Sequence, residues 1–143
     1  MAQTILADEY FRLTVDDPPG IVRFTRSEVA YPSGMAAAES LHHILDATAA
    51  ISRHRYSLLV DVRAAPGRND VDFEQALGEL RHRLFDGFRK QATLVRTAVG
   101  RLQVGRLARE HRLATANAFE SEQDAVAYLL ATATPVATPA GVR

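Results

Sequence analysis

The sequence contains no cysteine, no net charge and no long apolar run, and Lys90 is its only lysine among 17 basic residues. Without cysteine, disulfides, zinc–thiolate sites and cysteine nucleophiles are excluded. The 17 acidic residues balance the basic ones, which argues against a protein that binds nucleic acid through overall charge. No stretch approaches the roughly 18 apolar residues that a membrane span needs. What remains is 143 residues with 47% apolar content, which is typical of one globular domain.

The two ends of the chain differ from the middle. Residues 1–7 have neither the positive start nor the apolar run of a signal peptide, so we expect a cytoplasmic protein. Residues 131–143 consist mostly of small residues with two prolines, and such a segment cannot bury a core. We therefore predict a single domain over residues 1–130 and a flexible tail over residues 131–143.

A hairpin is predicted near the start of the chain. Apolar and polar residues alternate from Phe11 to Val15, which is typical of a half-buried strand. Residues 17–20 read Asp-Pro-Pro-Gly, a strong turn sequence. Residues 21–26 then form a second strand, with Val22 and Phe24 on one face and Arg23 and Thr25 on the other. The pattern predicts two antiparallel strands joined by that turn.

Helices and strands then alternate. Pro32 and Ser33 precede a helix with Ser33 as its N-cap and an inward face of Ala37, Leu41, Ile44, Leu45, Thr48 and Ile51. Residues 56–63 form the clearest strand, residues 92–99 a third core strand, and residues 117–120 a short last strand. Between and after these strands lie three further helices. Their expected starts are Asn69 or Asp70, Gly100 and Ser121, and their expected inward residues are Phe73, Leu77, Leu80 and Leu84, then Leu102, Leu107 and Ala108, then Ala125, Val126, Leu129 and Leu130.

The predicted order is ββαβαβαβα, an α/β fold with a mixed sheet and an N-terminal antiparallel hairpin. In the first strands one face is polar, with Arg12 and Thr14, then Arg23 and Thr25, then Asp61 and Arg63. A sheet covered by helices on both sides needs two apolar faces. We therefore expect the helices mainly on one face, with the other face partly open.

This order resembles the STAS-like fold of the anti-sigma-factor antagonists, and more closely the bacterial SpoIIAA-like or STAS/SEC14-type small proteins. The resemblance lies in residues 56–63, in residues 92–103 (ATLVRTAVGRLQ) and in Ala118-Phe119 with the helix that contains residues 124–129 (DAVAYL). It implies a regulatory module that binds a protein partner. In the antagonists a phosphorylatable serine follows the strand equivalent to residues 56–63. Here residues 63–70 read RAAPGRND, so the phosphate acceptor is missing at the matching place.

The first candidate site is an anion or partner site at the carboxyl ends of the parallel strands, where ligands of such sheets bind. Arg63 and Arg68 follow one strand, and Thr97 and Arg101 follow the next. Arginine offers a planar fork that suits phosphate or carboxylate. The alternative is that these arginines are solvated or pair with nearby aspartates such as Asp61, and no glycine-rich phosphate loop is present.

The second candidate is the polar sheet face of Arg12, Arg23, Asp61 and Arg63, which either binds a partner or forms a structural Asp–Arg network. If this face is covered, Asp61 must be paired, because a lone buried carboxylate is costly. A third feature is a basic surface on the helix that begins at Gly100, where Arg106 and Arg109 are neighbours. A solvated helix face is the alternative explanation for that surface.

No catalytic, cofactor or metal site is predicted. The five histidines lack the i, i+4 spacing of a helical metal site, and no G-x-S-x-G nucleophile motif occurs. Our first hypothesis is therefore a non-enzymatic STAS-like module that binds a protein partner and forms a homodimer through an open sheet face or edge. The alternative is a binder of a small anionic or lipid-like ligand that uses Arg63, Arg68, Thr97 and Arg101.

Overall fold

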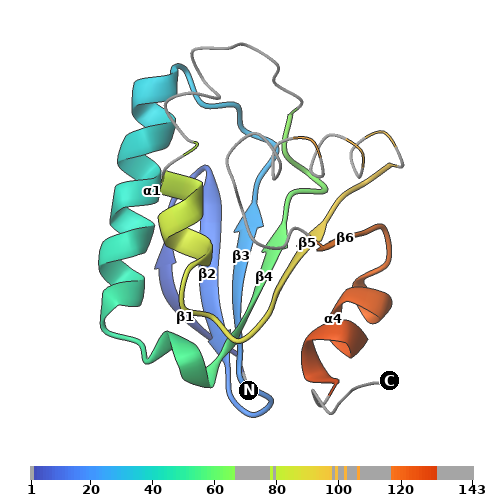
Figure 1. Ribbon diagram of the computed structural model, residues 1–143. Helices are drawn as coiled ribbons and strands as arrows, with labels where there is room; N and C mark the ends of the chain where they lie inside the picture. The colour runs from blue at the N-terminus through green and yellow to red at the C-terminus, as the bar shows by residue number, and fades with distance from the viewer. Residues whose placement is uncertain are drawn as a thin grey trace.

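The computed structural model describes residues 2–66, 80–97 and 117–131, together with positions 78, 99, 102 and 106. Within these residues a six-stranded sheet has the order β1-β2-β3-β4-β5-β6 (Figure 1). The strands are β1 (Ala2–Ala7), β2 (Phe11–Asp16), β3 (Ile21–Arg26), β4 (Ser57–Asp61), β5 (Gln91–Leu94) and β6 (Asn117–Phe119). The described helices are α1 (Gly34–Ala49), the 3-10 turn η1 (Arg53–Arg55), a helical stretch at residues 80–85 and α4 (Glu122–Leu130).

The sheet is mixed, as predicted. β1, β2 and β3 pair antiparallel, whereas β3, β4, β5 and β6 pair parallel. The predicted hairpin is therefore confirmed, and its second strand has the predicted bounds. Gly20 closes the turn with a φ of 96°, a conformation that L side chains rarely adopt.

β1 was not predicted, so the observed order begins with three strands rather than two. All its residues except Leu6 are exposed, because β1 is an edge strand. β4 and β6 are shorter than predicted, and β5 ends at Leu94 although we expected a strand to residue 99. Val95 is still buried, but Arg96 and Thr97 are exposed in a bend, and Val99 is already helical. The strand predicted from hydropathy to reach residue 99 therefore ends early, shortly before two exposed polar residues.

The first face of the sheet carries the main core. Leu13, Val22, Phe24, Leu58 and Val60 point to this face and pack against α1 and the 80–85 helix. The inward face of α1 is confirmed for Ala37, Leu41, Ile44, Leu45 and Thr48, all of which are buried. Leu80 and Leu84 are buried as predicted, whereas Phe73, Leu77, Leu107 and Ala108 lie outside the described residues.

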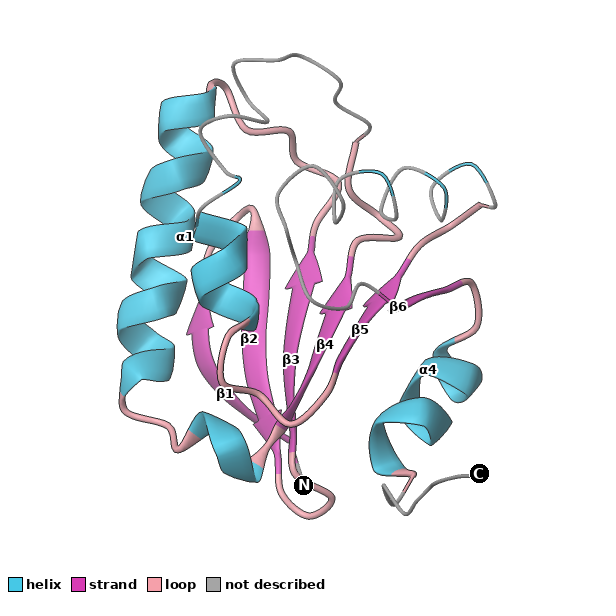
Figure 2. Ribbon diagram, viewed as in Figure 1, coloured by secondary structure: helices cyan, strands magenta, loops and turns pink. Residues whose placement is uncertain are grey.

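The second face is covered only in part. Alternate residues of β3, β4 and β5, namely Ile21, Leu59, Ala92 and Leu94, pack against Ala125 and Leu129 of α4. Over β1 and β2 the same face is polar and carries Thr4, Arg12 and Thr14, and no described helix covers it. Figure 2 shows α1 and the short helix at one side of the sheet and α4 at the other. The prediction that the helices lie mainly on one face is confirmed. α4 is the described helix on the second face, and it packs on the apolar part of that face.

The inward orientation predicted for two residues is wrong. Leu102 is 75% exposed and Leu130 is 43% exposed. The helical spacing of apolar residues defines a face, but whether that face meets a neighbour depends on the tertiary structure. No helix of the described part of the chain is long and apolar enough to cross a lipid bilayer.

Candidate functional site

The most densely connected polar group in the described residues is centred on Asp61, the last residue of β4. Asp61 is 5% exposed and lies on the second face of the sheet, opposite Thr25 of β3 in the ladder and on the same face as Arg23. Its carboxylate accepts hydrogen bonds from the Arg63 backbone N (3.1 Å), Arg63 Nε (3.0 Å) and Arg63 Nη2 (2.8 Å). A fourth bond comes from Arg23 Nη2 at 3.2 Å. The predicted structural Asp–Arg network is therefore present for Arg23, Asp61 and Arg63, but the contacts of Asp61 do not include Arg12, which is exposed. Asp61 is paired as its burial requires.

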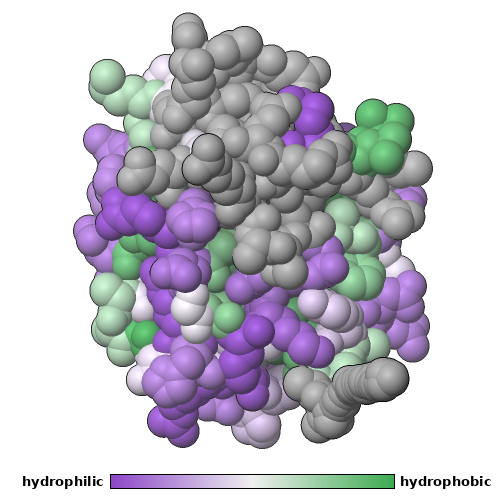
Figure 3. All heavy atoms as spheres, viewed as in Figure 1, coloured by the Kyte–Doolittle hydropathy of each residue, from purple (hydrophilic) through white to green (hydrophobic). Residues whose placement is uncertain are grey.

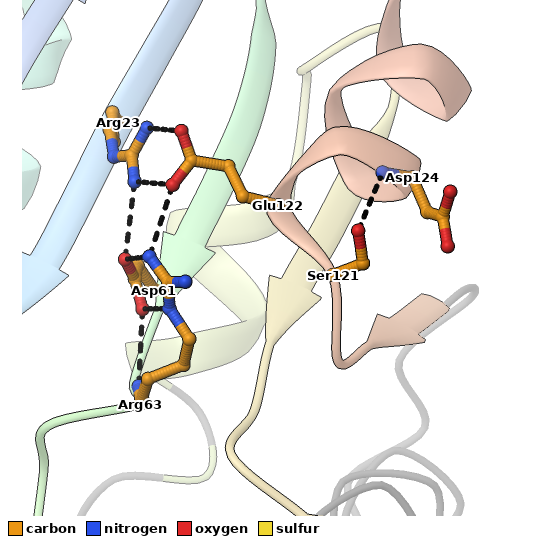
Figure 4. Close-up of polar contacts among 6 residues, drawn as sticks. All are labelled: Arg23, Asp61, Arg63, Ser121, Glu122 and Asp124. Atoms are coloured by element: carbon orange, nitrogen blue, oxygen red, sulfur yellow. Dashed lines mark hydrogen bonds and ion pairs between the residues drawn. The ribbon is translucent and has the colours of Figure 1, made fainter.

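Glu122 joins this network from α4. Its Oε2 and Oε1 accept from Arg23 Nη1 (3.1 Å) and Nη2 (2.9 Å), and Oε1 also accepts from Arg63 Nη2 at 3.0 Å (Figure 4). The carboxylate of Glu122 thus receives a bidentate pair of bonds from one arginine and a third bond from another. We refer to Arg23, Asp61, Arg63 and Glu122 as the charge network.

The start of α4 brings Glu122 to this position. Ser121 is the N-cap, as predicted, and its hydroxyl accepts from the Asp124 backbone N. Glu122 and Asp124 both lie in the first turn, where a carboxylate also interacts favourably with the helix dipole. In Figure 4 the Asp124 carboxylate points away from the network, whereas that of Glu122 points into it.

Electrostatics holds all four groups of the charge network in their charged forms. Burial raises the pKa of Asp61, but the hydrogen bonds from Arg63 and Arg23 outweigh it and keep that pKa below its ordinary value. The hydrogen bond from Arg23 lowers the pKa of Glu122. In return, Glu122 raises the pKa of Arg23, and Asp61 raises that of Arg63. The network carries two positive and two negative charges and is neutral as a unit.

The structure brings together only part of the predicted site. Asp61 and Arg63 lie in direct contact, and Thr97 lies exposed in the bend after β5. Arg68 and Arg101 lie outside the described residues, as does Arg109. Glu122 was not among the predicted site residues, and its only sequence signal is an acidic residue directly after the N-cap Ser121. No group of three or more acidic or histidine side chains in the described part of the chain is placed to hold a metal ion.

Exposed apolar side chains occur in the segments that follow the parallel strands. Val29 follows β3, Met35 opens α1, and Val99 and Leu102 follow β5. Their exposed fractions are 38%, 81%, 73% and 75%. The loops after β3, β4 and β5 all lie at the top of Figure 1, and Figure 3 shows a group of strongly hydrophobic atoms at the upper right of that end. We call Val29, Met35, Val99 and Leu102 the apolar rim.

Together, these features define a small α/β protein with the STAS-type fold, as the sequence resemblance predicted. A crystal structure of an anti-sigma factor antagonist from Mycobacterium paratuberculosis superposes with a TM-score of 0.54. The alignment covers 86% of this chain and 97% of that one, at 17% sequence identity. No protein-family model matches the sequence, and the comparison with curated proteins gives no match.

Proposed function

We propose that this chain is a non-enzymatic STAS-like module that acts by binding a protein partner in bacterial regulation. Its fold is shared with a protein described as an anti-sigma factor antagonist, which supports a role in binding rather than in catalysis. Fold alone does not establish function, so the proposal depends on the surface of this chain.

The observation that carries the proposal is the apolar rim. Four large apolar side chains are exposed near one end of the sheet, and three of them have more than two thirds of their surface in contact with water. Val99 and Leu102 are three residues apart in sequence and both are helical, so they lie on the same helix face. Large exposed apolar side chains are typical anchors of protein-binding sites, and we propose that Val99 and Leu102 take this role here.

Polar groups at the same end supply the outer part of the proposed contact. Arg63 is 39% exposed, and its partners Asp61 and Glu122 leave it anchored rather than mobile. Arg63, Thr97, Arg68 and Arg101 are the residues that we propose to meet polar groups of the partner. Asp61 is buried, so we propose that it acts by positioning Arg63 and does not touch the partner itself.

Capture of a partner from an extract of the source cell tests this proposal. The immobilised chain is compared with Leu102→Asp, which places a charge in the apolar rim, and with Leu130→Asp, which places the same charge at the end of α4. We expect a protein that is retained by the unmodified chain and by Leu130→Asp but lost with Leu102→Asp. A protein retained equally by all three, or no retained protein in repeated experiments, would contradict the proposal.

A further inference from the structure

Arg23 and Arg63 form a cradle for a two-oxygen anion, and this cradle is filled by the chain's own Glu122. Both Glu122 oxygens are bound, at 2.9 to 3.1 Å, by three guanidinium N–H groups from two different segments. This is the arrangement by which arginine binds a free carboxylate or phosphate group. The anion in the cradle is a side chain of α4.

The cradle does not depend on Glu122 for its shape. Asp61 binds Arg63 through Nε and Nη2 and binds Arg23 through Nη2, so one buried carboxylate holds both guanidinium groups. Arg23 also stands on β3, which is paired on both sides in the sheet. If Glu122 leaves, two arginines and one aspartate remain, with a net charge of one positive unit. An anion that enters then restores neutrality.

Glu122 is the member of the charge network that is easiest to displace. Its side chain is 44% exposed, compared with 7% for Asp61. It lies in the first turn of α4, a helix of nine residues in which only Ala125 and Leu129 are buried. The other end of α4 is held separately, because Lys90 Nζ donates to the carbonyls of Tyr128 (2.9 Å) and Ala131 (3.0 Å). The contacts that hold the last turn of α4 are therefore separate from those that Glu122 makes in the first turn.

We propose that the Arg23–Arg63 cradle is an exchangeable binding site for a carboxylate or phosphate group of a ligand, and that Glu122 occupies it until that ligand displaces it. Binding of the anion releases the first turn of α4 from the sheet. This goes beyond the proposed partner binding, because it assigns an anion site to Arg23 and Arg63, of which only Arg63 is also proposed to meet the partner. The test uses small anions only, so its failure leaves that function untouched.

Vacating the cradle by substitution tests the proposal directly. Glu122→Gln removes the internal anion, and Asp124→Asn removes a first-turn carboxylate that has no contact with the cradle. Thermal unfolding of both variants and of the unmodified chain is followed against sodium phosphate and, separately, sodium acetate, with chloride keeping the ionic strength constant. We expect a saturable rise in Tm for Glu122→Gln with at least one of these anions. The unmodified chain should need roughly tenfold more anion or higher, because Glu122 competes at a high effective concentration.

Further variants make the outcome decisive. Adding Arg63→Gln to the Glu122→Gln variant should abolish the anion effect. Glu122→Ala, made in the unmodified chain, should show the same rise in Tm as Glu122→Gln, which separates the effect from any disturbance of the helix by Gln. In the unmodified chain, saturating anion should speed hydrogen exchange at the Ala125 and Val126 amides without changing that of β4. A response to phosphate alone or to acetate alone identifies the class of anion. The proposal is overturned if Glu122→Gln responds no more than Asp124→Asn, or if the response survives Arg63→Gln.

Discussion

Replacing Asp61 by asparagine tests the organisation of the charge network. The substitution keeps the size of the side chain but removes its charge, and it turns an amide NH2 toward guanidinium groups that are themselves donors. Asp61 accepts four hydrogen bonds from two arginines, so the loss affects both. One hydrogen bond to a charged group contributes about 1.5–3 kcal/mol net. The four are not additive, because Arg23 and Arg63 are 28% and 39% exposed and water can replace part of the loss.

We therefore expect Asp61→Asn to lower the free energy of unfolding by about 2 kcal/mol at pH 7 and to lower Tm by roughly 6 °C. Urea unfolding followed by circular dichroism measures this difference. Asp124→Asn is the control, with an expected change within about 0.5 kcal/mol, because the structure gives its carboxylate no partner among the described residues. A loss for Asp61→Asn no larger than that of the control would refute the network as described.

The pH dependence of the same difference gives a second check. The pKa of Asp61 lies below its ordinary value in the folded chain, so its stabilising contribution is complete above the ordinary aspartate pKa of about 3.9. The contribution is lost as the pH falls through the lower folded-state pKa. The difference in stability between the unmodified chain and Asp61→Asn should therefore stay constant near neutral pH and shrink below about pH 4. A difference that grows in acid would have the wrong sign.

Three further outcomes follow from the fold. Ser33→Ala removes the hydroxyl that accepts from the Ala36 backbone N, and urea unfolding should show a loss of about 1 kcal/mol, whereas no loss would contradict the capping assignment. Gly20→Ala forces a side chain onto a φ of 96°, with Arg89 Nη2 3.4 Å from the new Cβ, and should lower the free energy of unfolding by about 1–2 kcal/mol in the same assay. If two copies pair through the β1 edge or the uncovered face beside it, sedimentation at rising concentration shows a dimer that Thr4→Pro weakens, and a monomer at all concentrations would rule out such pairing.

The central strands could be predicted because their sequence patterns reflect burial directly. β2 alternates, and β3 alternates from Val22 to Thr25. β4 is apolar from Leu58 to Val60, since both of its faces are covered. β1 was not predicted, for the opposite reason. It is exposed along nearly all of its length, so its residues AQTILA carry no alternation, and only pairing with β2 makes them a strand.

The charge network was predicted in part. A polar strand face that bears Asp61 and arginines indicates that they pair, because the residues of one face of a sheet are neighbours. Glu122 could not be found in this way, since it lies 99 residues from Arg23 and reaches it only through the packing of α4. The exposure of Leu102 was missed because a helical pattern gives the spacing of apolar residues but not the partner that covers them.

Site-specific photo-crosslinking in the source cell tests the proposed function most directly. A photoreactive amino acid is placed at Leu102 in the apolar rim or, in a second strain, at Leu130, the last residue of α4, which ends near the bottom of Figure 1. The account predicts one discrete crosslinked protein from position 102 and none from position 130. Crosslinks of equal yield from both positions, or none from position 102, would contradict the claim that this end of the sheet binds a protein partner.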